Sequence, residues 1–187
     1  MMKSKRVFIA INVELSSDLS RVFQELKDEL ESDRIRWVPE NNFHITLRFL
    51  GDLQPDQIEI VKLILDEVCS KKRAFVFKLY QVDFFKHRGN PSVLFFNLDR
   101  VEDFVCLSGT IQKRLNEKGI SSNKKFTPHL TLARLKEIKD LSNFYHVVDK
   151  YREIPTQEIK ADRVIFYESV LKPSGAEYHV LDEYQLS

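Results

Sequence analysis

The sequence contains no hydrophobic run long enough to cross a membrane. Its longest apolar stretches, such as VFIAI at 7–11, are far shorter than the roughly 20 residues of a spanning helix, and shorter than a typical signal-peptide core. We therefore expect a cytoplasmic protein with no membrane partner.

The only two cysteines, Cys69 and Cys106, lack a second cysteine or histidine at zinc-site spacing, so both are expected to be apolar core residues.

Glycine is scarce as well, and none of the five glycines belongs to a phosphate-binding loop. No serine or cysteine stands in a nucleophile elbow. The net charge is only +1, which gives little long-range attraction to nucleic acid, so any contact with RNA must be local. The local candidates are the basic segments 71–73, 86–88 and 123–125, each of which is also typical of a solvated loop.

The chain has enough apolar sequence for one compact domain of two lobes, since 43% of its 187 residues are hydrophobic and 30% are charged. Hydrophobic periodicity predicts helices at 17–32, 55–70, 99–119 and 140–150, and strands at 5–12, 43–50, 74–84, 92–98, around 129, 159–170 and 177–185. The three longer helices carry start signals: a serine cap at Ser16 or Ser17, Pro55 at the first turn, and a capping box of Asp99 with Glu102.

An offset of 85 residues maps the first half of the chain onto the second. It carries strand 6–12 onto 91–97, helix 17–32 onto 102–117 and strand 74–84 onto 159–169. This pattern predicts an internal duplication within one domain at 1–187, with repeats at about 6–90 and 91–185. Two related lobes would pack about a pseudo-twofold axis and bring equivalent residues together.

The segments FHITLRFLG at 43–51 and FTPHLTLAR at 126–134 carry the same pair at equivalent positions of this repeat, His44 with Thr46 and His129 with Thr131. Side chains two residues apart on a strand share a face and lie roughly 6.6 Å apart. Each strand should therefore present an imidazole and a hydroxyl on one side and leucine or isoleucine on the other. A single motif is as easily a structural histidine, but two copies at equivalent positions argue for one shared site.

Two imidazoles and two hydroxyls suit the hydrolysis of a phosphodiester without a metal. One neutral histidine can take a proton from water while a protonated one gives a proton to the leaving oxygen. The threonines can donate to the non-bridging oxygens as negative charge builds. A metal-dependent route would need carboxylates beside the histidines, and neither motif has one, so no metal or other cofactor is expected.

The sequence resembles the two-histidine phosphoesterase superfamily, in particular the RNA 2′,3′-cyclic phosphodiesterases, also called 2′-5′ RNA ligases. The resemblance rests on RVFIAIN at the start, the two His-x-Thr segments and PSGAEYHVLDEYQL near the end, and it spans nearly the whole chain. It implies an α+β fold of two lobes, in which two antiparallel sheets flank a central cleft and helices lie outside.

The resemblance also implies a role for each matching residue. His44 is expected to protonate the 3′ oxygen, His129 to activate water, and Thr46 with Thr131 to hold the phosphoryl oxygens. Arg134 matches an arginine that could clamp the phosphate, although strict alternation places it opposite His129 unless the strand has a bulge. Arg48 shares the parity of His44, so strand alternation favours it over Arg134 as the cation beside the site.

The expected substrates are RNA ends or small cyclic nucleotides, and the protein is expected to act as a monomer. Two other functions remain open: ligation of RNA through a 2′-5′ linkage by the reverse chemistry, and a non-catalytic module that binds nucleotides or RNA. Many relatives carry a basic residue where this chain has Ser92, which leaves open how the terminal base or the neighbouring phosphate is held.

Overall fold

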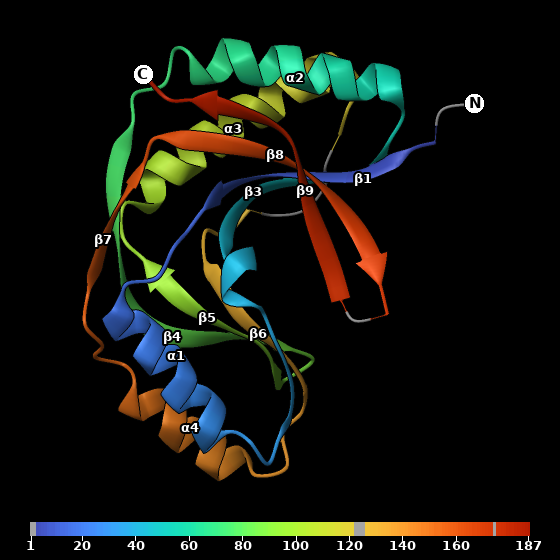
Figure 1. Cartoon of the computed structure of the whole chain (residues 1–187). Helices are drawn as coiled ribbons and strands as arrows, with labels where there is room; N and C mark the ends of the chain where they lie inside the picture. Colours follow the sequence, from blue (N-terminus) through green and yellow to red (C-terminus); the bar gives the residue numbers. More distant parts are fainter. Residues whose placement is uncertain (1–2, 122–125, 174) are drawn as a thin grey trace.

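The computed structural model describes residues 3–121, 126–173 and 175–187, so the predicted basic segment 123–125 lies outside the described residues. Two antiparallel sheets face each other, and pairs of helices cover their outer faces (Figure 1). This is the α+β arrangement that the resemblance implied. None of the helices in the described segments is long and apolar enough to span a membrane.

The first sheet has four strands in the order β3-β1-β8-β9, and the second has five in the order β2-β6-β5-β4-β7. The strands are β1 (Lys5–Asn12), β2 (Arg34–Trp37), β3 (His44–Leu53), β4 (Phe75–His87), β5 (Asn90–Leu98), β6 (Leu130–Glu137), β7 (Gln157–Ala161), β8 (Arg163–Lys172) and β9 (Gly175–Gln185). Neither sheet comes from one half of the sequence, because β4 joins the second sheet while β8 and β9 join the first.

Helices α2 (Pro55–Cys69) and α3 (Val101–Glu117) cover the first sheet, and α1 (Ser17–Glu29) with α4 (Leu141–Lys150) covers the second (Figure 1). Their buried faces join the sheets in one connected hydrophobic core. The predicted start of α1 is confirmed, since the Ser16 hydroxyl accepts from the backbone N–H of Leu19, and Pro55 does begin α2.

Three sequence predictions are wrong, and two short elements were missed. The short strand β2 and the 3-10 helix η1 (Glu40–Asn42) were not predicted, and the strand expected at 159–170 is interrupted at Asp162. The capping box of α3 does not form, because the Asp99 carboxylate accepts from the backbone N–H of Lys78 and Arg100 takes the cap position. Cys69 is buried as expected, whereas Cys106 is exposed and is not a core residue.

The two strand pairs that carry the His-x-Thr motifs share one register at the 85-residue offset. In the first sheet Phe8 pairs with Phe49, Ile9 with Arg48 and Ala10 with Thr46; in the second, Val93 pairs with Arg134, Leu94 with Ala133 and Phe95 with Thr131. Both ladders skip one residue at the same place, Leu47 in β3 and Leu132 in β6. Each skip is a β-bulge, which reverses the alternation of the side chains that follow.

The carbonyl of each bulged leucine finds a partner outside its ladder. The hydroxyl of Ser108, a fully buried residue of α3, donates to the carbonyl of Leu47 at 3.0 Å. The backbone N–H of Val38 donates to the carbonyl of Leu132 at 2.8 Å. A buried carbonyl without such a partner would lose the free energy of a hydrogen bond to water, so these contacts stabilise both bulges.

Replacing Ser108 with alanine should therefore destabilise the fold. We expect Ser108→Ala to lower the free energy of unfolding by about 1–3 kcal/mol, because the carbonyl of Leu47 stays buried without a donor. Urea denaturation measures this change. The matched control is Thr110→Ala on the exposed face of the same helix, where the hydroxyl donates only to the carbonyl of Cys106. Equal stability losses in the two variants would contradict the proposed support of the bulge.

Candidate active site

Both motifs lie where their strands begin. His44 is the first residue of β3, and His129 immediately precedes β6. Thr46 and Thr131 are partly exposed, whereas the residues that follow each histidine and threonine, Ile45, Leu47, Leu130 and Leu132, are buried. The expected division into a polar face and an apolar face is therefore present. In the described residues neither threonine hydroxyl has a hydrogen-bond partner, so both remain available to a ligand.

The two imidazoles make the same local hydrogen bond. Nδ1 of His44 lies 2.7 Å from the carbonyl oxygen of Asn42, and Nδ1 of His129 lies 2.7 Å from that of Thr127. A carbonyl oxygen can only accept, so each Nδ1 must carry the hydrogen. In the neutral ring this leaves Nε2 with a free lone pair, and in the charged ring it leaves Nε2–H. Either form presents Nε2 to a ligand.

Aromatic rings surround both histidines. His44 packs against Phe8 and Tyr178, with ring centroids 5.0 and 5.3 Å apart. His129 packs against Phe85 at 4.9 Å and Phe95 at 5.3 Å. Burial lowers the pKa of His44 to about 4 and also lowers the pKa of His129, because a less polar environment disfavours the imidazolium. The carbonyl hydrogen bonds oppose this effect only in part.

The structure brings the two motifs to one place. Strands β3 and β6 contact each other although they belong to different sheets. The charge of His129 also contributes to the lowered pKa of His44, an interaction that requires the two rings to be near each other. The guanidinium of Arg134 contributes in the same way to the lowered pKa of His129.

The bulges decide where the two candidate arginines point. After Leu132 the alternation in β6 reverses, so the exposed Arg134 returns to the face of Thr131, and the bulge that its predicted role required is present. The equivalent bulge at Leu47 turns Arg48 away from the face of His44. Its Nε donates to the carbonyl of Ser108 at 3.4 Å, and its guanidinium lies 5.9 Å from the ring of Phe126. Strand alternation therefore no longer favours Arg48 as a substrate ligand.

Two further arginines lie near the site and were not predicted. Burial raises the pKa of Tyr178, while the charges of Arg134, Arg36 and Arg6 act to lower it, so all three guanidinium groups lie within electrostatic range of this tyrosine. Arg36 belongs to β2, which has no clear periodicity in the sequence. Phe8, Phe85 and Phe95 were also missed as neighbours of the histidines. The unbroken apolar runs of β1 and β5 do indicate burial on both faces for Phe8 and Phe95, whereas Phe85 lies in β4.

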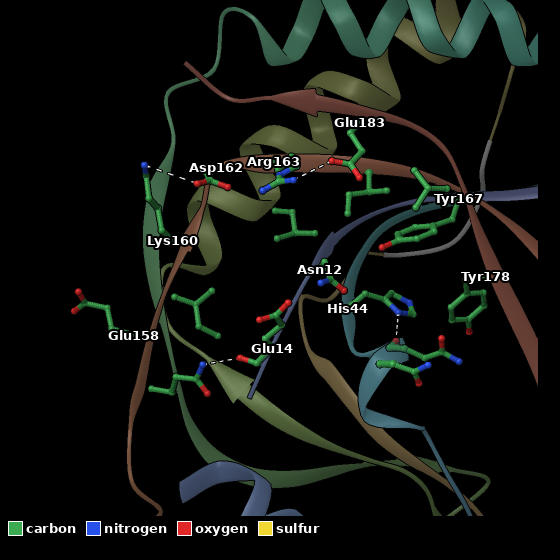
Figure 2. A pocket seen from close by; sticks show the side chains of 17 residues that line it. Asn12, Glu14, His44, Glu158, Lys160, Asp162, Arg163, Tyr167, Tyr178 and Glu183 are labelled. Atoms are coloured by element: carbon green, nitrogen blue, oxygen red, sulfur yellow. Dashed lines mark hydrogen bonds and ion pairs between the residues drawn. The ribbon is translucent and has the colours of Figure 1, made fainter. Parts of the chain in front are cut away.

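A cavity of about 590 Å³ opens beside His44, between the first sheet and strand β7 (Figure 2). Asn12, Tyr167 and Tyr178 line it near the imidazole, and His129 is not part of its lining. The rest of its lining is rich in charge, with four carboxylates and two cations from Glu14, Glu158, Asp162, Glu183, Lys160 and Arg163. In the described part of the chain, no three histidine, cysteine or acidic side chains are placed to hold a metal ion together.

Two facing antiparallel sheets that each contribute a histidine and a threonine define a class of α+β phosphoesterases. The family model described as LigT like Phosphoesterase matches residues 9–95 and 107–178. The chain belongs to this LigT-like phosphoesterase family, as the motifs suggested.

Named relatives cover nearly the full length of the chain. An RNA 2′,3′-cyclic phosphodiesterase of Thermotoga maritima is 30% identical over 185 residues, which are 96% of this chain and 95% of the relative. One of Aquifex aeolicus is 30% identical over 190 residues, 99% of each chain.

Among solved structures, TT0787 of Thermus thermophilus has a TM-score of 0.76 at 24% identity and covers 97% of both chains. Escherichia coli LigT complexed with 3′-AMP has a TM-score of 0.72 at 16% identity, over 100% of this chain and 99% of that one. These two structural similarities show that the chain shares the fold of both proteins.

The burial of His44 has a consequence for stability. Its pKa falls from 6.5 in the unfolded chain to about 4 in the folded one, so the unfolded state binds more protons between these values. The contribution of neutral His44 to the free energy of unfolding should therefore be fully present above pH 6.5. It should decrease as the pH falls towards 4, by at most about 1.4 kcal/mol per pH unit. We expect His44→Gln to remove this part of the pH dependence.

Urea denaturation at pH 7, 6 and 5 measures the effect. The difference in unfolding free energy between His44→Gln and the wild type should shift in favour of the variant as the pH falls. His87→Gln, a change at an exposed histidine of β4, serves as the control and should show no such trend. A constant difference between His44→Gln and the wild type would contradict the burial of a neutral imidazole.

Proposed function

We propose that the protein hydrolyses 2′,3′-cyclic phosphate ends of RNA or of nucleotides to 2′-phosphates, and that His44 and His129 act as acid and base without a metal. The observation that carries this proposal is the shared orientation of the two imidazoles. Both hold Nδ1–H on a backbone carbonyl and leave Nε2 free, and the charge of His129 acts on the pKa of His44, which supports one ligand between the two rings. General acid-base catalysis needs two such groups, one to accept a proton and one to donate it.

In the proposed reaction, Nε2 of neutral His129 takes a proton from water as the water oxygen attacks phosphorus. The bond between phosphorus and the 3′ oxygen breaks, and Nε2–H of protonated His44 gives its proton to that oxygen. The products are a 2′-phosphate and a 3′-hydroxyl. The hydroxyls of Thr46 and Thr131 donate to the non-bridging oxygens, and Arg134 offsets their growing negative charge.

The lowered pKa of each histidine shapes this mechanism. Both rings are mainly neutral at pH 7 in the free protein, so the acid must gain its proton together with the anionic substrate, whose charge raises the pKa of nearby imidazoles. His44 has a pKa of about 4, and a ring of low pKa is the stronger acid once protonated. This supports His44 as the donor to the leaving oxygen.

The relatives and the ring neighbours support the same reaction. The Thermotoga and Aquifex proteins are named RNA 2′,3′-cyclic phosphodiesterase. The groups packed on the histidines are phenylalanine and tyrosine rings, with Arg134 nearby, and none of these is a usual metal ligand. The expected monomeric state and cytoplasmic location remain predictions.

Removing either imidazole should abolish most of the activity. We expect His44→Ala and His129→Ala each to lower kcat by at least about 100-fold, the scale of one acid or base group, on a 2′,3′-cyclic mononucleotide and on an RNA oligomer with a cyclic end. Chromatography of the products measures the rate and separates 2′-phosphates from 3′-phosphates. The exposed His87→Ala should keep wild-type activity.

EDTA should leave the rate of the wild type unchanged. Full activity in either His44→Ala or His129→Ala, or strong inhibition by EDTA, would contradict the mechanism. Binding of the cyclic nucleotide without any turnover would instead indicate a non-catalytic nucleotide-binding module.

A further inference from the structure

Arg36 and Arg134 form an unfavourable pair in the absence of a ligand. They lie directly opposite each other in the ladder between β2 and β6, and both are exposed. Like charges at such positions destabilise a sheet unless a counter-charge lies between or beside them. Within the described residues, neither of them makes an ion pair with a carboxylate, and the same holds for Arg6. An anion bound by these residues would relieve the repulsion.

Arg36 also reaches across the cleft to the other sheet. A side-chain carbon on Gly175, at the start of β9, would lie 3.1 Å from Nη2 of Arg36. Tyr178, three residues further along β9, has its ring edge-on to His44 at 5.3 Å. Arg36 and Arg6 act on the pKa of Tyr178 together with Arg134. Arg36 and Arg134 therefore lie on the side of His44 that carries the tyrosine, and the charge of Arg6 acts on the same ring.

The opposite side of His44 has a different charge. The lining of the cavity in Figure 2 carries four carboxylates and two cations, and the figure places them on the side of His44 away from Tyr178. Both cations are already paired, Arg163 with Glu183 at 3.0 Å and Lys160 with Asp162 at 3.8 Å. Such a surface repels a phosphate and suits hydroxyl and amino groups, which are donors. A second phosphate of the substrate must therefore lie on the arginine side.

We propose that Arg36, assisted by Arg6, binds a second phosphate of the substrate, the one on the 5′ oxygen of the terminal nucleotide. Arg134 would then hold the reacting phosphate, one strand away across the ladder. This inference takes the class of substrate from the proposed function and rests on it. The bound group is a phosphodiester when the substrate is RNA and a monoester when it is a nucleotide with a 5′-phosphate. The protein thus prefers ends that carry a phosphate on the 5′ oxygen over nucleoside cyclic phosphates that lack one.

Isothermal titration calorimetry with two reaction products tests this inference without requiring turnover. The probes are adenosine 2′-phosphate and adenosine 2′,5′-bisphosphate, which differ only in the 5′-phosphate. We expect the wild type to bind the bisphosphate about tenfold more tightly, the scale of one charge-assisted hydrogen bond. Arg36→Gln should reduce this ratio of Kd values to about one. A dinucleotide ending in a 2′-phosphate separates the diester from the monoester.

Arg34→Gln is the matched control, because Arg34 lies on the same strand, is exposed and faces Glu137 across the ladder. It removes the same charge and should keep the wild-type ratio. A wild-type ratio near one, an unchanged ratio in Arg36→Gln, or equal losses in both variants would overturn the inference. Preference for the bisphosphate in a protein that hydrolyses no cyclic phosphate would contradict the proposed function and support this subsite.

Discussion

A short hydrogen bond from imidazole to backbone orients both halves of the site. Nδ1–H donates to the carbonyl two residues earlier in the chain, at His44 and again at His129. Since the bond is local, each strand that begins with this motif orients its own ring without a contact from the other sheet. Aromatic neighbours then remove the remaining freedom of rotation and lower the pKa of both rings. The fold then brings the two oriented rings together between the sheets.

The paired bulges determine which residues join the histidines. A regular strand would place the residue five positions after each histidine on the far face, whereas the bulges at Leu47 and Leu132 bring Phe49 and Arg134 to the near face. One half of the site therefore gains an aromatic ring and the other gains a cation. The hydroxyl of Ser108 in α3 holds the carbonyl of Leu47, and the backbone of Val38 at the end of the neighbouring strand β2 holds that of Leu132. The first bulge is therefore supported by the covering helix and the second by the adjacent strand.

Much of this arrangement could be predicted from the sequence, because strong periodicity and a repeated motif are local signals. The helices, most strands and the two His-x-Thr pairs follow from them. The exchange of β4, β8 and β9 between the sheets could not be predicted, since it depends on long-range packing. Arg48 was favoured over Arg134 because alternation was assumed, and a bulge leaves no mark in a single sequence. Arg36 was missed because β2 has only four residues and owes its strand conformation to pairing with β6.

Nitrogen-15 NMR of the imidazole rings tests the central claim most directly. At neutral pH, both His44 and His129 should carry their hydrogen on Nδ1, and adenosine 2′-phosphate should shift the Nε2 resonances of both rings together. A hydrogen on Nε2 of either ring in the free protein, or a response of only one ring to the ligand, would contradict the account of two imidazoles held by their own backbone around one phosphate.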